Sequence, residues 1–201
     1  MKRVNQFERT DRDITNALLK VMESKSLEKI SVQDILDEAM INRSTFYQHF
    51  PDKYAILERL QEKYVSGMTE RIDEIARSGE WDLGKINDSL CGYLAQNRSQ
   101  MRQILSVRSE NLDLQGRMRA LFVAYLRRAK TSLNELEMDI LAGVTVNFFV
   151  HFLKNEINET DLSGMMMDTW LEMTAFFFRV DDVPDAKNRI LTLIGQMHQE
   201  K

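Results

Sequence analysis

The sequence contains few of the residues that cross-link or interrupt a chain. It has one cysteine, two prolines and eight glycines in 201 residues. The single cysteine, Cys91, cannot form an intrachain disulfide, which fits a reducing compartment such as the cytoplasm. Only Pro51 and Pro184 would interrupt a helix, so long helices are permitted over most of the chain.

Signals for a membrane, a metal or a catalytic centre are also missing. No apolar run reaches the roughly 18 residues of a transmembrane helix, and the N-terminus lacks the apolar core of a signal peptide. The three histidines, His49, His151 and His198, are scattered, so no metal-ligand spacing is present. There is no phosphate-cradling glycine loop. We therefore expect a cytoplasmic protein with no cofactor or metal; a helical enzyme would require a catalytic cluster that the sequence does not contain.

The charge balance excludes a chain that coats nucleic acid by charge alone. Lys and Arg number 27 and Asp and Glu number 31, for a net charge of −4. Residues 1–63 are electrically balanced, so the whole excess of acid lies in residues 64–201. A local DNA-binding surface remains compatible with these numbers.

Capping signals divide the first third of the chain into short helices. An apolar stripe over residues 14–22 predicts a helix that Thr10 or Asp11 could cap. Ser31 with an acid three residues later predicts the start of a second helix, and Asn42 predicts the start of a third. The turn between the second and third helices falls near Met40.

The rest of the chain has helical periodicity as well. A long helix is expected from Lys53, capped by Asp52 and ended by residues 78–84. Further helices are expected at about 85–96, 98–109, 112–131, 134–155, 161–179 and 185–199. The fold class predicted is all-α, with a three-helix domain over residues 1–60 and a larger helical domain over residues 61–201.

Two short helices joined by a tight turn form a helix-turn-helix candidate, whose second helix would enter the major groove of DNA. At 100° per residue, Phe46 and Phe50 share a face suited to the core. The opposite face carries side chains that can read base edges, by small size or by paired hydrogen bonds. These are Arg43, Ser44, Thr45 and Gln48.

Other side chains of this segment are suited to phosphate oxygens. Tyr47, His49 and Lys53 lie at the edges of the face, and the helix-start amides near Ser31 could hold a phosphate. The alternative is that this face is merely solvated, as most polar helix faces are.

The stretch SVQDILDEAMINRSTFYQHFPDKYAIL resembles the DNA-binding signature of the TetR (tetracycline-repressor-like) family of bacterial regulators. Residues 45–50 and Lys53 match that signature in type and spacing, and the resemblance covers roughly residues 10–60. It implies phosphate contacts for Tyr47, His49 and Lys53 and base contacts for the four residues above. Met40 departs from the pattern, because many members have glycine there, and a positive φ would strain methionine.

Two segments of the larger domain, 134–155 and 162–178, are apolar nearly all round, which indicates burial on every side. The resemblance implies that they pair with a partner's copies in a homodimer. The interface candidates are Phe149, Phe152, Trp170 and Phe177. The alternative is that both are central core helices of one chain.

An effector pocket is implied on the middle helices. Its candidate apolar and aromatic lining consists of Tyr93, Met101, Leu105, Phe122 and Tyr125. Asn147 and His151, one turn apart, are either a polar handle in that pocket or a satisfied pair in a core or interface.

The resulting hypothesis is a homodimeric transcriptional regulator, a repressor, that binds a pseudo-palindromic double-stranded DNA operator and responds to a small-molecule effector. It would lie in the bacterial cytoplasm, at the nucleoid when bound to DNA. The alternative retains the DNA-binding half and makes the larger domain a docking module for a protein partner.

Overall fold

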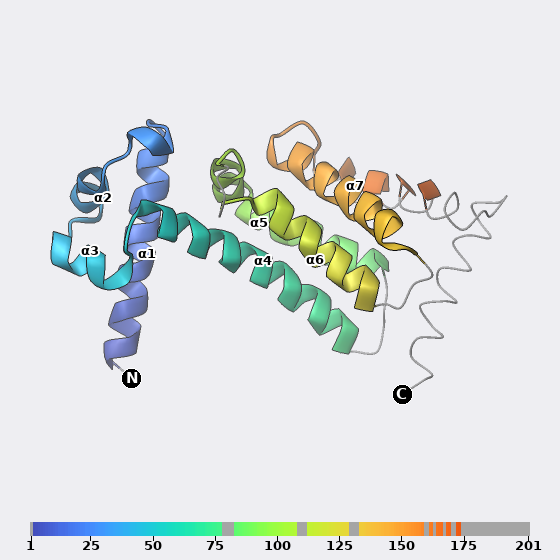
Figure 1. Cartoon of the computed structure of the whole chain (residues 1–201), viewed down its shortest axis with the longest axis horizontal. Coiled ribbons are helices and arrows are strands. Elements are labelled where there is room, and N and C mark those ends of the chain that lie inside the picture. The colour runs from blue at the N-terminus through green and yellow to red at the C-terminus, as the bar shows by residue number, and fades with distance from the viewer. Residues whose placement is uncertain are drawn as a thin grey trace. The chain divides into compact units, whose positions relative to one another are not determined.

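The computed structural model describes residues 2–77, 83–107, 112–128 and 133–158, with short runs between 161 and 173. Over these residues the chain is built from helices, which confirms the predicted all-α class (Figure 1). In chain order they are α1 (Lys2–Met22), the short 3-10 helix η1 (Leu27–Lys29), α2 (Val32–Ala39), α3 (Arg43–His49), α4 (Lys53–Arg77), α5 (Leu83–Leu105), α6 (Leu114–Arg128) and α7 (Glu135–Leu153).

The chain forms two compact units. The first comprises residues 1–64 and 99–114, and the second comprises residues 65–98 and 115–201. The divisions fall inside α4 and inside α5, so each of these helices contributes to both units. The proposed boundary of a DNA-binding domain at residue 60 stays a prediction.

Helix α1 begins well before its expected cap. It starts at Lys2, and the Thr10 hydroxyl donates to the Gln6 carbonyl oxygen at 3.1 Å, within the helix. The prediction that Thr10 or Asp11 caps the start of the helix was therefore wrong. The apolar stripe itself is confirmed, because Ile14 and Leu18 are fully buried.

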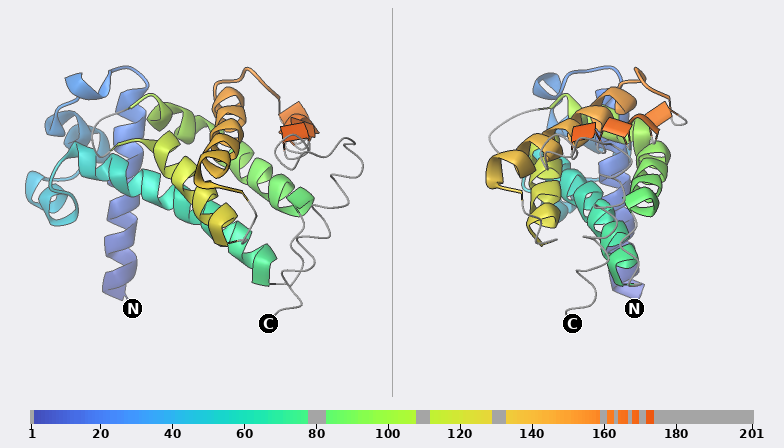
Figure 2. Two further views of the ribbon diagram at one scale, coloured as in Figure 1. Left: turned by 45° about the vertical axis from the view of Figure 1, so that its right-hand side comes forward. Right: turned by 90° about the vertical axis from the view of Figure 1, so that its right-hand side faces the viewer.

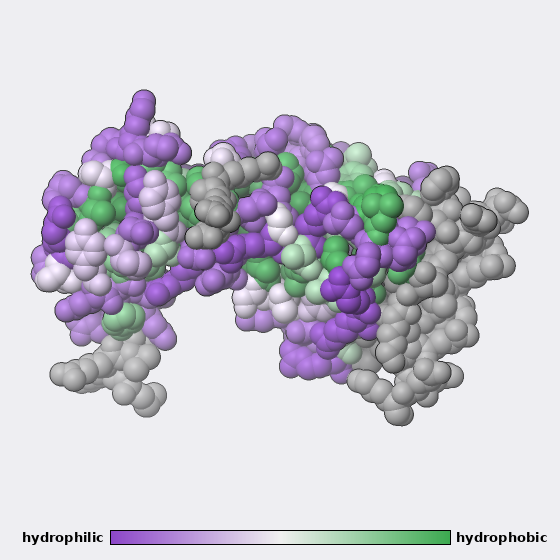
Figure 3. Space-filling view, in the orientation of Figure 1, coloured by the Kyte–Doolittle hydropathy of each residue, from purple (hydrophilic) through white to green (hydrophobic). Residues whose placement is uncertain are grey.

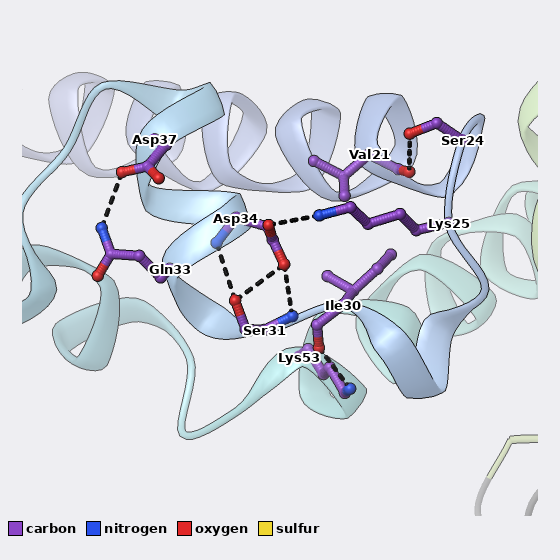
Figure 4. A network of polar contacts seen from close by, with 9 residues as sticks. All are labelled: Val21, Ser24, Lys25, Ile30, Ser31, Gln33, Asp34, Asp37 and Lys53. Atoms are coloured by element: carbon purple, nitrogen blue, oxygen red, sulfur yellow. Dashed lines mark hydrogen bonds and ion pairs between the residues drawn. The ribbon is translucent and has the colours of Figure 1, made fainter.

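Helix α2 begins with the predicted capping box. The Asp34 backbone N–H donates to the Ser31 hydroxyl at 3.2 Å, and the Asp34 carboxylate accepts the Ser31 backbone N–H at 2.8 Å (Figure 4). Lys25 donates to the same carboxylate at 2.6 Å. This lysine, together with the hydrogen bonds from Ser31, lowers the pKa of Asp34 to about 2. Charge and hydrogen bonding thus fix the start of α2.

The turn after α2 has the backbone that glycine favours. Met40 has φ 53° and ψ 43°, in the left-handed region, and the Ile41 N–H donates to the Leu36 carbonyl at 3.2 Å. This six-to-one hydrogen bond is typical of a Schellman ending. The turn keeps its geometry although methionine occupies the strained position.

One long helix, α5, replaces two expected ones. Segments 85–96 and 98–109 were predicted as separate helices, but α5 runs without a break from Leu83 to Leu105. Asn97, the expected break, donates its amide to the Tyr93 carbonyl at 2.8 Å, inside the helix. The predicted division into two helices was therefore wrong, because the helix continues through Asn97.

Helices α4, α6 and α7 pack together within the second unit (Figure 2). The Tyr125 hydroxyl on α6 donates to the Asp73 carboxylate on α4 at 2.8 Å. Arg127 on α6 donates to Glu135 on α7 at 2.7 Å, and the Phe122 and Phe149 rings lie 5.7 Å apart. By length and composition alone, α7 could cross a membrane, but buried core helices of soluble proteins meet the same criterion. Half of its most apolar 18-residue segment is buried inside the structure.

Candidate nucleic-acid interface

A single side chain fixes the N-terminal end of α3. The Asn42 side-chain oxygen accepts the Thr45 backbone N–H at 2.8 Å, the Thr45 hydroxyl at 2.9 Å and the Ser44 hydroxyl at 2.6 Å. Both hydroxyl hydrogens are therefore used locally, while their oxygens can still accept hydrogen bonds from outside.

The two faces of α3 divide as predicted. Phe46 and Phe50 are 0% and 1% exposed, and their rings lie 6.4 Å apart in the core of the first unit. The outward residues are exposed or half-buried: Arg43, Ser44, Thr45, Tyr47 and Gln48. Donors, acceptors and an aromatic ring are thus presented to solvent from one two-turn helix.

His49, the last residue of α3, is turned inward. Its side chain is only 5% exposed, and its ring stacks on Phe7 of α1 with centroids 3.9 Å apart. The ring nitrogen Nδ1 pairs with the Asp11 carboxylate, which also accepts from Arg59 of α4. The predicted phosphate contact of His49 stays a prediction.

Lys53, the first residue of α4, is engaged by the backbone. Its ammonium group donates to the Ile30 carbonyl oxygen at 2.6 Å (Figure 4). It also donates to the carbonyl oxygens of Leu27 at 2.7 Å and Glu28 at 3.3 Å. These carbonyls belong to η1 and to the residue that follows it, directly before Ser31, and that of Leu27 also accepts the Ile30 backbone N–H at 3.2 Å. Lys53 therefore joins the start of α4 to the segment that precedes α2, and its predicted phosphate contact also stays a prediction.

The candidate effector residues are divided between the two units. Met101 and Leu105 are buried in the first unit, whereas Tyr93, Phe122 and Tyr125 belong to the second. Burial raises the pKa of the Tyr93 and Tyr125 hydroxyls. A shared role for these five residues in one pocket stays a prediction.

The polar pair on α7 lies on an exposed face of that helix. Asn147 is exposed, and the His151 side chain is 44% exposed and pairs with Glu156. This placement fits the interface alternative better than a polar handle inside a pocket.

The interface candidates occupy different environments. Phe149 and Phe152 are fully buried within the chain, so they would not contact a partner directly and would only pack behind the interface residues. Trp170 and Phe177 lie outside the described residues. The exposed apolar residues of α7 are instead Leu136 and Ile140, at 67% and 37% exposed. Hydrophobic surface is visible where the first turns of α7 lie (Figure 3).

The sequence interpretation gave no structural role to Asp11 beyond a possible cap. Its partners lie 38 and 48 residues further along the chain, too far for any helical spacing to connect them. The only local signal is its place one turn after Phe7, on the same side of α1. Among the described residues, no group of three His, Cys, Asp or Glu is placed to hold a metal ion.

Comparison with known proteins agrees with this geometry. Residues 14–60 match the family described as bacterial regulatory proteins, tetR family. No curated protein matches the chain.

Several solved structures share the fold. One, described as a TetR-family transcriptional regulator from Syntrophomonas wolfei, is 17% identical with a TM-score of 0.67, covering 81% of this chain and 93% of its own. A TetR regulator from Streptococcus agalactiae is 19% identical with a TM-score of 0.63, covering 85% and 98%. A gamma-butyrolactone receptor is 16% identical with a TM-score of 0.54, covering 98% and 99%. Residues 14–60 thus carry a DNA-binding region of the tetR family of bacterial regulatory proteins, and the chain shares the fold of these regulators.

Proposed function

We propose that the protein is a homodimeric repressor that binds a pseudo-palindromic operator and releases it when a small molecule binds the second unit. The observation that carries this proposal is the outward face of α3, which presents polar side chains from a helix capped at one end and anchored in the core by Phe46 and Phe50.

Base readout is assigned to the side chains with paired donors and acceptors. Gln48 and Arg43 can each form bidentate hydrogen bonds, Gln48 to adenine and Arg43 to guanine, at base edges in the major groove. Ser44 and Thr45 are small enough to permit close approach, and their oxygens can accept hydrogen bonds from bases. Each correct bidentate contact contributes roughly 1–3 kcal/mol of discrimination.

Backbone contacts position the helix without carrying sequence information. Tyr47 is 49% exposed beside the base-reading face, and Ser31 is exposed at the N-terminus of α2, where free amides favour an anion. His49 and Lys53 complete the proposed phosphate set. Because both already have partners within the chain, each would contact DNA only with hydrogen-bonding capacity that those partners leave.

The exposed side of α7 supports the proposed dimer. Leu136 and Ile140 lie one turn apart, and Asn147 and His151 continue the same side of the helix. A two-fold dimer would cover these residues with their own copies. Two copies of α3 would then reach successive major grooves, with centres about 34–36 Å apart.

Control by a small molecule is supported by the second unit and by one relative. Buried aromatic residues from α5 and α6, Tyr93 and Phe122, are the kind of lining that small apolar ligands prefer. One similar structure is described as a gamma-butyrolactone receptor. We propose that the effector here is also a small, largely apolar molecule.

Selection of DNA from a random pool with the purified full-length protein tests the proposal. We expect enrichment of an inverted repeat whose half-sites are separated by about one helical turn, or a multiple of it. Failure to enrich any sequence would overturn the proposal. Repeating the selected-site binding with gamma-butyrolactones and other small apolar molecules should reveal release by one class. If no class releases DNA and a protein partner does, the docking alternative replaces effector control.

A further inference from the structure

We propose that Asp11 is a positioning residue, which fixes the C-terminal end of α3 so that its outward face is set for sequence-specific DNA binding. The inference rests on the proposed function, because it concerns how α3 reads bases. It assigns to α1 a role that the helix-turn-helix itself does not include.

The two oxygens of the Asp11 carboxylate hold two different helices. Oδ1 pairs with Nδ1 of His49, the last residue of α3, and Oδ2 accepts from Arg59 of α4. The Arg59 guanidinium in turn lies 4.4 Å from the centre of the Phe50 ring, directly after α3. One carboxylate on α1 therefore connects the end of α3 to α4.

The environment of His49 makes this connection rigid. Phe7, one turn before Asp11 on α1, stacks on the imidazole ring at 3.9 Å. The His49 side chain is 5% exposed and the Asp11 side chain 21% exposed. The stacking holds the imidazole ring nearly parallel to Phe7. The pairing of Nδ1 with the Asp11 carboxylate then stops the ring from turning within its own plane.

The geometry of α3 explains why both ends need to be held. The helix has seven residues, about two turns, so it is not stable by itself. Its position and orientation depend on contacts with the rest of the unit. Asn42 holds its first turn through local hydrogen bonds. At the other end, the Asp11 pair supplies a tertiary contact. Side chains that read bases must be held within about 0.5 Å of the binding geometry, and contacts from neighbouring residues provide that precision.

Charge alone predicts the opposite effect of removing Asp11. DNA binding is dominated by phosphate charge, so loss of a carboxylate on this unit should strengthen binding to every DNA sequence. A positioning role predicts that specific binding weakens relative to nonspecific binding. The ratio of the affinity for the operator to that for nonspecific DNA therefore distinguishes a positioning role from a simple charge effect.

The experiment compares Asp11→Asn with Asp13→Asn in the full-length protein, using the selected operator and a scrambled duplex. Asp13 is an exposed acid on the same helix, so it controls for charge. We expect Asp11→Asn to lower the operator-to-scrambled affinity ratio by at least about tenfold, comparable to losing one good base contact. Asp13→Asn should leave the ratio unchanged.

A double-mutant cycle tests whether Asp11 acts through His49. His49→Ala should lower the ratio similarly, and adding Asp11→Asn to it should cause little further loss. Circular dichroism checks that each variant is folded, and if Asp11→Asn is not, His49→Ala alone must show the loss. An unchanged ratio in folded variants, or fully additive losses, would overturn the inference. Wild-type protein that does not prefer the operator would instead overturn the proposed function.

Discussion

At the scale of single residues, Met40 adopts a backbone that costs a methionine free energy. Its φ of 53° brings Cβ close to the following carbonyl oxygen, and its side chain is 91% exposed. Little packing is therefore available to offset the strain. Its neighbour Ala39 is the last residue of α2 and has ordinary helical geometry. Glycine is therefore expected to be favourable at position 40 and unfavourable at position 39.

Met40→Gly should raise the free energy of unfolding by about 0.5–1 kcal/mol, because glycine relieves the left-handed strain. Ala39→Gly, one residue earlier, should lower it, because glycine in a helix loses more conformational entropy. Urea unfolding of the two variants measures both changes. A loss of stability in Met40→Gly would show that the turn is not strained.

The capping carboxylate of α2 predicts a pH dependence. The Lys25 ammonium and the Ser31 hydrogen bonds lower the pKa of Asp34 from 3.8 to about 2. A lowered pKa stabilises the fold fully above pH 3.8, and that contribution is lost as the pH falls towards 2. Asp34→Asn should therefore be less stable than wild type at pH 7, and the difference should shrink below pH 4. Thermal melts across this range test it; a constant difference would contradict it.

The distance along the chain separates what could be predicted at this scale from what could not. Ser31 and Asn42 were identified as caps because their partners lie three residues away. The partners of Lys53 and His49 lie 23 to 38 residues away, so no periodicity indicates them. Only the folded chain reveals that these two side chains also hold helices together.

At the scale of elements, α4 and α5 pack closely at Gly67. A Cβ built on Gly67 would lie 2.2 Å from the Tyr93 hydroxyl oxygen and 2.6 Å from its Cζ. Arg71 donates to the Gly67 carbonyl at 2.8 Å and lies 4.0 Å from the centre of the Tyr93 ring. This crossing leaves no room for a side chain. In contrast, a Cβ on Gly92 of α5 meets nothing within 4 Å.

Gly67→Ala should destabilise the protein by about 1–3 kcal/mol, because overpacking outweighs the gain in helix propensity. Gly92→Ala, in open space, should stabilise it by up to about 1 kcal/mol. Chemical unfolding of both variants, and of Gly67→Ala with Tyr93→Phe, measures the effect. Tyr93→Phe should recover part of the loss, and equal effects at the two glycines would contradict a close crossing.

Helix positions were predicted better than helix ends. Stripes and caps identified α2, α3 and α4, since each begins at a residue with a capping side chain. The start of α1 and the continuity of α5 were missed. In both helices a polar side chain, that of Thr10 or Asn97, bonds a carbonyl four residues earlier, which the sequence does not distinguish from a cap.

At the scale of the whole molecule, the proposed assembly depends on the exposed side of α7. The sequence indicated that this helix is apolar nearly all round, but not which residues face outward. Phe149 and Phe152 are buried within the chain, whereas Leu136 and Ile140 are accessible. A charge introduced at a buried phenylalanine would damage the fold, so the exposed residues give the cleaner test.

Ile140→Glu should shift the protein from dimer to monomer, because a desolvated, like-charged pair would form across the two-fold axis. Ala124→Glu, on the exposed side of α6, is the charge control and should remain dimeric. Sedimentation at micromolar concentration distinguishes the two. A wild-type monomer, or an Ile140→Glu dimer of unchanged stability, would contradict the proposed interface.

The central claim is that the outward face of α3 reads DNA bases, and Gln48 tests it most directly because its exposed amide lies on that face. The measurement is parallel selection from random DNA with wild type and Gln48→Ala. The account predicts that the preference changes at one position in each half-site, with a loss of roughly 1–3 kcal/mol of discrimination there. Two superimposable sequence preferences would contradict it.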